Sequence, residues 1–202
     1  GLGAIVRAFD VRAGVADQIK SLGGEFLTVS VQESGDGQGG YAKEMSKEFL
    51  EAEYALFRAQ AKEVDIVITT ALIPNKPAPK LWFKDMVELM KPGSVMVDVA
   101  IDQGGCFETS RATTHTDPIY YVDSVLHYCV SNMPAAVPHT STFALNNATL
   151  PYLLTLANKG LEAAARSSRA IAEGVNTYKH HCVYRAVAES QGLAFTELSG
   201  LL

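Results

Sequence analysis

The chain has 202 residues, of which 48% are hydrophobic and 19% charged, so it can bury a substantial core in one or two globular domains. Its net charge of -5 and its lack of any run rich in Lys and Arg argue against a nucleic-acid partner, because phosphate binding relies on clustered cations. No apolar run reaches the roughly 18 residues that span a bilayer, and the three widely spaced cysteines suit reduced thiols, so we expect a cytoplasmic protein without a membrane span.

Apolar, strand-like runs alternate with helix-like segments through the first half of the chain, which predicts a parallel sheet wrapped by helices. The runs at 65–72 and 94–100 are continuously apolar, which predicts strands buried on both faces. Residues 31–44 contain four glycines and predict an exposed loop. The other expected strands are 4–9 and 25–30, and the expected helices lie within 15–24, 44–63 and 82–90.

The expected helix at 44–63 has apolar residues spaced three to four apart, which predicts a single buried face. The apolar positions are Met45, Phe49, Ala52, Leu56 and Ala59. After it, the prolines of 73–80 cannot continue a strand and predict a loop.

The second half of the chain begins with a polar loop at 101–118, followed by two short expected strands at 120–122 and 126–130. From Ser141 the pattern changes to two or three helices, with Pro151 and Gly160 as interruptions. A final helix is expected to stop at Gly192.

The first expected strand ends at Asp10, as the second strand of a dinucleotide-binding fold ends in the acid that binds a ribose. The glycines at positions 1 and 3 do not begin a G-x-G-x-x-G motif, because residue 6 is Val and a strand starts within the motif. We therefore expect Gly3 to cap a helix, with the first strand and the phosphate-binding glycine loop lying before residue 1.

Several long motifs resemble the family of alanine dehydrogenase and the alpha subunit of NAD(P) transhydrogenase. Residues 3–93, with LGAIVRAFDVR, GQGGYAKEMS and ITTALIPNKPAPKL, look like the transhydrogenase alpha subunit. Residues 94–202, with SVMVDVAIDQGG, YCVSNMPAAVPHTSTFALNNATLPY and GVNTYK, look like alanine dehydrogenase. The resemblance implies an α/β fold: a Rossmann-like parallel sheet that lacks its first strand and glycine loop, followed by C-terminal helices.

The same resemblance implies two domains and a function. Residues 1–140 would form a partial NAD(H)-binding domain, and the helical segment 141–202 would return to a substrate domain. The expected function is the NAD-binding portion of an alanine dehydrogenase-like oxidoreductase, which converts L-alanine, NAD and water to pyruvate, ammonium and NADH by hydride transfer. Two alternatives stay open: the NAD(H)-binding domain of a proton-translocating transhydrogenase alpha subunit, and a truncated nucleotide-binding module without catalysis. The amino-acid or oxo-acid substrate would need an upstream domain, and we expect a homo-oligomer.

The candidate catalytic residue is Asp102, which follows a strand and precedes two flexible glycines. By resemblance it lies beside the nicotinamide and the substrate, where a carboxylate can orient a water or an amine. The alternative is a loop aspartate that only forms a turn.

The candidate cofactor-binding residues follow the expected strands. Asp10 can accept hydrogen bonds from the ribose and repel a 2′-phosphate, which favours NAD, although a solvated surface acid is the alternative. Arg12 lies close enough to soften this preference or to act at a helix N-terminus. By resemblance the remaining cofactor contacts are Ala71, Leu72, Val99, Val130, Asn132 and Met133. The spacing of His115, His127, His180 and His181 does not suit a metal site, and we expect none.

Overall fold

A computed structural model describes residues 2–12, 14–31, 33–35, 45–73 and 76–202. The chain divides into two compact units, Gly1–Met133 and Pro134–Leu202. Most of the expected glycine-rich loop, Glu44 at the start of the expected helix, and Pro74 of the proline loop lie outside the described residues.

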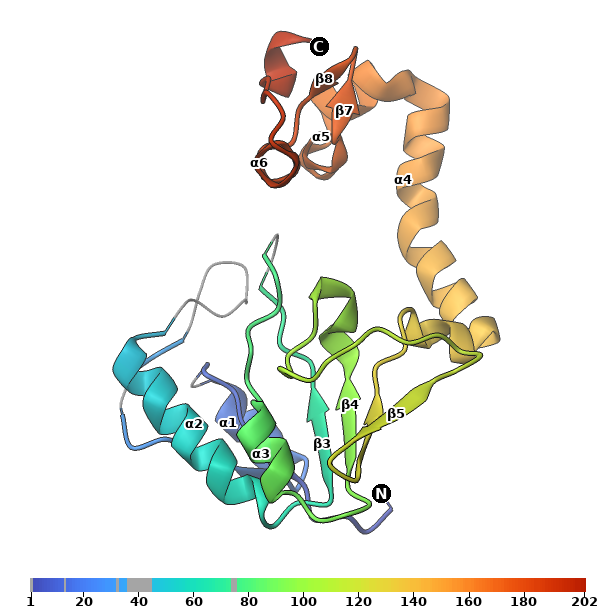
Figure 1. Cartoon of the computed structure of the whole chain (residues 1–202). Helices are drawn as coiled ribbons and strands as arrows, with labels where there is room; N and C mark the ends of the chain where they lie inside the picture. The colour runs from blue at the N-terminus through green and yellow to red at the C-terminus, as the bar shows by residue number, and fades with distance from the viewer. Residues whose placement is uncertain (1, 13, 32, 36–44, 74–75) are drawn as a thin grey trace. The chain divides into compact units, whose positions relative to one another are not determined.

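The first unit contains two separate sheets (Figure 1). One is a parallel pair, β1 with β2, and the other has the strand order β3-β4-β6-β5. Within the second sheet β3, β4 and β6 run parallel, whereas β5 is antiparallel to β6. The predicted α/β fold with a parallel sheet is confirmed. The strands are β1 (Arg7–Ala8), β2 (Glu25–Phe26), β3 (Ile66–Thr69), β4 (Val95–Asp98), β5 (Ile119–Val122) and β6 (Val125–Tyr128).

The helices of the first unit follow the predicted order. They are α1 (Val15–Ser21), α2 (Lys47–Ala61), α3 (Lys84–Leu89) and the short 3₁₀ helix η2 (Val99–Gln103). Helices α2 and α3 cover one face of the larger sheet (Figure 1). The core between them gathers apolar side chains from both helices, from β4 and β6 and from the loops around Trp82 and Phe107.

A tight hairpin joins β5 to β6. Val122 pairs with Val125, so that Asp123 and Ser124 alone form the turn. Both residues have positive φ, at 49° and 64°, as a type I′ turn requires. The two short strands expected here are therefore an antiparallel pair at one end of the sheet.

The buried face of α2 differs from the predicted one. Phe49 is buried as expected, but it is followed by Glu53, Phe57 and Ala61, whereas Ala59 is exposed. The difference arises because Glu53 occupies a position that the geometry of the helix directs toward the core. A prediction from hydropathy alone places a glutamate at the surface.

The predicted burial of β3 on both faces is wrong. Ile66 and Ile68 are 60% and 63% exposed. β3 pairs with β4 on one edge only, and the β1–β2 pair belongs to another sheet. Among the described residues no strand pairs β1 with β3.

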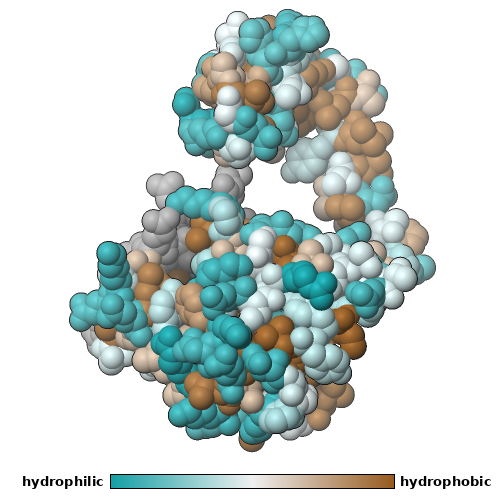
Figure 2. All heavy atoms as spheres, viewed as in Figure 1, coloured by the Kyte–Doolittle hydropathy of each residue, from teal (hydrophilic) through white to brown (hydrophobic). Residues whose placement is uncertain are grey.

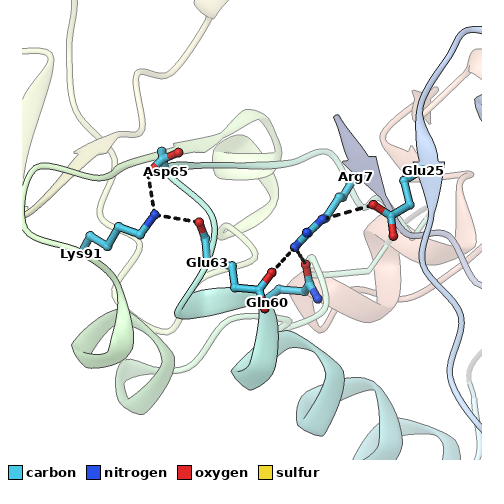
Figure 3. A network of polar contacts seen from close by, with 6 residues as sticks. All are labelled: Arg7, Glu25, Gln60, Glu63, Asp65 and Lys91. Atoms are coloured by element: carbon cyan, nitrogen blue, oxygen red, sulfur yellow. Dashed lines mark hydrogen bonds and ion pairs between the residues drawn. The ribbon is translucent and has the colours of Figure 1, made fainter. Parts of the chain in front are cut away.

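Side chains connect β1 to α2 across this open edge. The Arg7 guanidinium donates hydrogen bonds to Glu25 at 3.3 Å, to Gln60 at 2.8 Å and to Glu63 at 2.6 Å (Figure 3). Phe9 packs edge-on against Phe57, with ring centroids 5.2 Å apart. The β1–β2 pair is thus attached to the helix layer rather than to the neighbouring sheet.

The second unit is mainly helical, as predicted. The long helix α4 contains one non-helical residue, Gly160, and α6 ends at Gly192 in the left-handed conformation. The small hairpin β7–β8 was not expected from the sequence. None of the helices within the described ranges is long and apolar enough to cross a membrane. The elements are α4 (Pro138–Ser167), α5 (Arg169–Gly174), β7 (Thr177–Tyr178), β8 (His181–Cys182), α6 (Arg185–Gln191) and a 3₁₀ turn, η4 (Leu198–Gly200).

The burial of Glu53 predicts an unusual pH dependence of stability. Burial raises the pKa of Glu53 from an ordinary value of 4.5 to about 7. The folded chain therefore binds this proton more tightly than the unfolded chain, and the resulting stabilisation is complete below about pH 4.5 and is lost as the pH rises through about 7. Glu53→Gln, which imitates the protonated acid, should raise the free energy of unfolding above about pH 7 by up to about 3 kcal/mol.

Urea unfolding at a series of pH values measures this effect, and the difference between the variant and the parent should disappear toward about pH 4. The matched control is Glu51→Gln, an exposed position on the same helix. Parallel pH profiles for the parent and Glu53→Gln would show that Glu53 titrates normally.

Candidate functional site

The carboxyl ends of three adjacent parallel strands bring most of the candidate residues to one edge of the sheet. Ala71 and Leu72 follow β3, Val99 and Asp102 lie in η2 directly after β4, and Asn132 lies after β6. In open parallel sheets, ligands bind at this edge. The arrangement therefore unites residues that are up to 61 positions apart, from Ala71 to Asn132.

The carboxylate of Asp98, the last residue of β4, organises this edge. Asp98 is 0% exposed. Its Oδ1 accepts hydrogen bonds from the Thr69 hydroxyl and the Ala100 backbone N–H, both at 3.2 Å. Its Oδ2 accepts from the Cys106 backbone N–H at 2.8 Å and from the Ser110 hydroxyl. One buried carboxylate thus joins the end of β3 to both ends of the loop that carries Asp102.

Lys80 fixes the same loop from the other side. Its ammonium donates to the carbonyl oxygens of Gly104 at 2.8 Å, Gly105 at 2.7 Å and Phe107 at 3.0 Å. The sequence did not indicate this role of Lys80, and although the place of Asp98 within a strand suggests a structural residue, it did not identify the hydrogen-bond partners of Asp98. Pro77 and Pro79 restrict the backbone just before Lys80, which suggests that Lys80 has a fixed position. Its hydrogen-bond partners are backbone carbonyl oxygens, and no sequence pattern identifies them.

Asp102 is presented to solvent by the loop so formed. It lies in η2, whose first turn is capped by Asp98, and it is exposed. Within the described part of the chain its carboxylate accepts no hydrogen bond and pairs with no cation. An unengaged carboxylate on a firmly held turn can orient a water or an amine, or accept a proton.

Asp10 and Arg12 form a bidentate ion pair after the end of β1. The Arg12 side chain donates to Oδ1 of Asp10 at 2.9 Å and to Oδ2 at 2.7 Å, and its backbone N–H donates to Oδ1 at 2.8 Å. Partial burial acts to raise the pKa of Asp10, but these hydrogen bonds and the guanidinium charge outweigh it, so the pKa lies below its usual value. The carboxylate is ionised, and its charge is offset by Arg12.

A cavity of about 830 Å³ is lined by some of the candidate residues and not by others. Asp10, Arg12, Ala71 and Leu72 all line it, together with Thr69 and Thr70. Val99, Asp102, Val130, Asn132 and Met133 do not. The structure therefore places Asp10, Arg12, Ala71 and Leu72 around one hollow, and the other candidates after β4 and β6.

The residues after β6 differ in what they can offer a ligand. The Val130 side chain is 0% exposed, so a contact there would have to use the backbone. Asn132 is exposed and adopts a left-handed backbone with φ of 57°, and its carbonyl oxygen lies 3.0 Å from Nε2 of His115. Met133 is half-buried at the start of η3 (Met133–Ala136).

His115 and His127 make hydrogen-bond contacts with other groups of the chain. His127 is buried, and its Nε2 lies 2.8 Å from the Thr109 hydroxyl. Burial lowers the pKa of His127, so the ring is neutral near pH 7. Across the described residues no group of three or more His, Cys, Asp or Glu side chains is arranged to hold a metal ion.

Gly105 provides a direct test of the loop geometry. Its φ is +75°, and a Cβ atom there would lie 2.5 Å from Oδ2 of Asp98 and 2.6 Å from Ser110. Gly105→Ala should therefore lower the free energy of unfolding by about 2–4 kcal/mol, through both backbone strain and collision with the Asp98 network.

Gly104→Ala is the matched control, because Gly104 has φ of +91° and nothing within 4 Å of its added Cβ. It should cost about 1–2 kcal/mol, from the backbone alone. Chemical denaturation of both variants measures the difference, and equal losses would contradict the central role assigned to Asp98.

Comparison with known proteins places these features in a family. Residues 1–185 match the model of the alanine dehydrogenase/PNT C-terminal domain. Alanine dehydrogenase from Mycolicibacterium smegmatis is 43% identical over 202 residues, which are 100% of this chain and 49% of the relative.

Solved structures agree with the sequence match. An L-alanine dehydrogenase superimposes with a TM-score of 0.76 and 39% identity, over 95% of this chain and 47% of that one. A transhydrogenase from Sinorhizobium meliloti superimposes with a TM-score of 0.65 and 28% identity, over 92% and 44%. The chain thus spans slightly less than half the length of each of these proteins, and it belongs to the alanine dehydrogenase/PNT C-terminal domain family.

Proposed function

We propose that residues 1–202 form the NAD(H)-binding portion of an alanine dehydrogenase-like oxidoreductase, which interconverts L-alanine with pyruvate and ammonium. The observation that carries the proposal is the exposed Asp102 on a loop fixed by Asp98 and Lys80, at the carboxyl ends of parallel strands. The similarity to alanine dehydrogenases over the whole chain supports it.

The residues present fit the NAD cofactor. The cavity has apolar walls at Ala71 and Leu72, which suit a flat ring, and Asp10 has oxygen lone pairs that can accept from ribose hydroxyls even while Arg12 is bound. Asn132 offers both a donor and an acceptor to a carboxamide. When bound, NAD supplies the acceptor for the hydride removed from the substrate.

Asp102 would act on the substrate side. A carboxylate can hold the amino group in position, orient the attacking water and stabilise the positive charge that develops at the carbon losing hydride. The fixed loop matters here, because a carboxylate that moves by an ångström loses much of its effect.

The proposal includes the wider organisation of the protein. Residues 1–140 would be the nucleotide-binding domain and residues 141–202 a helical return to a substrate domain, and the compact units divide nearby, after Met133. Figure 2 shows apolar surface along α4. Phe143, Leu145 and Leu153 are among the exposed side chains of this helix, and such side chains support a homo-oligomer. The three cysteines are free and buried, which suits action in the reducing cytoplasm.

Transhydrogenase activity is the second candidate, supported by the structural likeness to the Sinorhizobium meliloti protein. In that reaction the same site would exchange hydride between two nicotinamides, and no carboxylate would be needed to handle water or an amine. The two candidates are separated by measuring alanine-dependent NADH formation against hydride exchange between nicotinamide nucleotides.

Asp102→Asn tests the catalytic assignment in a protein that carries this chain together with its substrate domain. Removing the charge while preserving the shape should lower alanine oxidation by about 100-fold or more, and the Kd for NADH should change by less than about twofold. Asp117→Asn, at another exposed loop position, is the control. If turnover of Asp102→Asn stays within about twofold of the parent, Asp102 is only a turn residue.

The ion pair of Asp10 with Arg12 predicts that two substitutions change the preference for NAD(H) over NADP(H) in opposite directions. We expect NAD(H) to bind more tightly than NADP(H). Arg12→Gln should strengthen this preference by about tenfold, because it removes the cation that offsets the Asp10 charge, and Asp10→Asn should weaken it by about tenfold, because it removes the negative charge that repels a 2′-phosphate. Calorimetric titration of both nucleotides measures the ratio, and shifts of the same sign in the two variants would be inconsistent with this account.

A further inference from the structure

The chain turns at Asn132, after β6, in a conformation that few residues adopt. Asn132 has positive φ, at 57°. The other such residues besides glycine that the structure describes form the two-residue turns of the β5–β6 and β7–β8 hairpins, and they are Asp123, Ser124, Lys179 and His180. Asn132 lies outside both hairpins, so its left-handed backbone needs another explanation. Strain of this kind persists where the surrounding structure holds it, and it is concentrated at ligand sites.

A closed loop, residues 113–118, lies beside this turn. The Thr113 N–H donates to the Cys129 carbonyl at 2.9 Å, and the Ser131 N–H donates to the Thr113 carbonyl at 3.2 Å. The Thr113 hydroxyl closes the loop by donating to the Pro118 carbonyl at 3.0 Å. The loop is therefore attached to the residues immediately before the turn and holds its own side chains next to it.

His115, in the middle of the loop, contacts the strained turn. Its Nε2 lies 3.0 Å from the carbonyl oxygen of Asn132. A carbonyl oxygen can only accept a hydrogen bond, so Nε2 carries the proton and donates it. The oxygen belongs to the peptide group that joins Asn132 to Met133, and both residues are candidate contacts of the cofactor. One hydrogen bond from His115 thus orients the peptide between them.

This bond matters more for orientation than for overall stability. His115 and Asn132 are both exposed, and a single hydrogen bond between exposed groups contributes little to the free energy of unfolding. A left-handed asparagine has other conformations of lower energy, however, and rotation of its peptide group redirects the side chain. Holding the turn in place before a ligand arrives removes the cost of ordering it from the free energy of binding.

We propose that His115 is a positioning residue for NAD(H), which holds the peptide after Asn132 so that the Asn132 amide faces the nicotinamide end of the cofactor. The inference rests on the proposed function, which assigns Asn132 to the cofactor. His115 acts through Asn132 and makes no contact with the substrate. Its substitution therefore weakens cofactor binding and leaves the chemical step intact.

The test measures the Kd for NADH by fluorescence titration, in a protein that carries this chain together with its substrate domain. His115→Ala should raise this Kd by about tenfold, while kcat at saturating NAD and alanine stays within about twofold of the parent, because only binding depends on the turn. Thr116→Ala, at an exposed position of the same loop, is the matched control and should leave the Kd unchanged.

Two further substitutions of His115 separate positioning from a general structural role. His115→Gln should restore the Kd to within about twofold of the parent, because the glutamine amide nitrogen reaches about as far as Nε2 and also donates a hydrogen bond. His115→Met has a side chain of similar length without a strong donor, so its Kd should match that of His115→Ala.

A double substitution tests whether His115 acts through Asn132. Asn132→Gly removes the amide, and glycine adopts the left-handed backbone without strain. This change should itself raise the Kd for NADH, and adding His115→Ala to it should raise the Kd by less than about twofold further, because the side chain that His115 positions is no longer present.

The proposal is overturned if His115→Ala binds NADH like the parent, if His115→Gln and His115→Met have equal Kd values, or if the effects of His115→Ala and Asn132→Gly are additive. Weaker binding in Asn132→Gly with normal binding in His115→Ala would keep the cofactor assignment and exclude this role of His115. Unchanged binding in Asn132→Gly would remove Asn132 from the cofactor site, and the role of His115 with it.

Discussion

The carboxylate of Asp98 holds together the edge of the sheet at which β3, β4 and β6 end. It receives hydrogen bonds from the end of β3, from η2 and from both Cys106 and Ser110, so the loop after β4 cannot shift without breaking several of them. Lys80 secures the same loop through carbonyl groups. The exposed Asp102 therefore stands on a rigid base, although it has no partner of its own among the described residues.

Glu53 shows the opposite use of a buried acid. Asp98 accepts four hydrogen bonds in a site built around it, whereas Glu53 lies among aromatic side chains and has none from the described residues. The contrast has a physical consequence, since the first carboxylate stabilises its surroundings and burial raises the pKa of the second to about 7. The same chain thus contains one buried acid that the surrounding backbone and hydroxyl groups stabilise as a carboxylate, and one whose pKa burial raises.

Much of the fold could be predicted from local patterns. The apolar runs located β3 and β4 to within a few residues, and Gly192 marked the end of α6, because periodicity and helix termination are local properties. The exposure of Ile66 and Ile68 could not be predicted in this way, since an apolar run does not reveal whether another element packs on each face of the strand.

The candidate site was predictable only in part, for related reasons. Asp10 and Arg12 are two residues apart, so their proximity was visible, but the bidentate geometry depends on how the chain turns after β1. The contacts of Lys80 are with backbone carbonyls, which every residue has, and the burial of Glu53 follows from the orientation of α2. The assignments of Asp102 and of the residues after β6 to catalysis and cofactor binding remain predictions.

The two-residue turn at Asp123 and Ser124 bears on the order in which this sheet assembles. Hairpins closed by such short loops lose little chain entropy, and they form within microseconds. Two parallel strands pair more slowly, because the long connection between them has to be ordered first. The hairpin can therefore act as a nucleus onto which β4 and then β3 add, each new strand finding a preformed neighbour. The β1–β2 pair has no such neighbour in this order, so we expect it to be the last part of the first unit to become ordered and the first to be lost on unfolding.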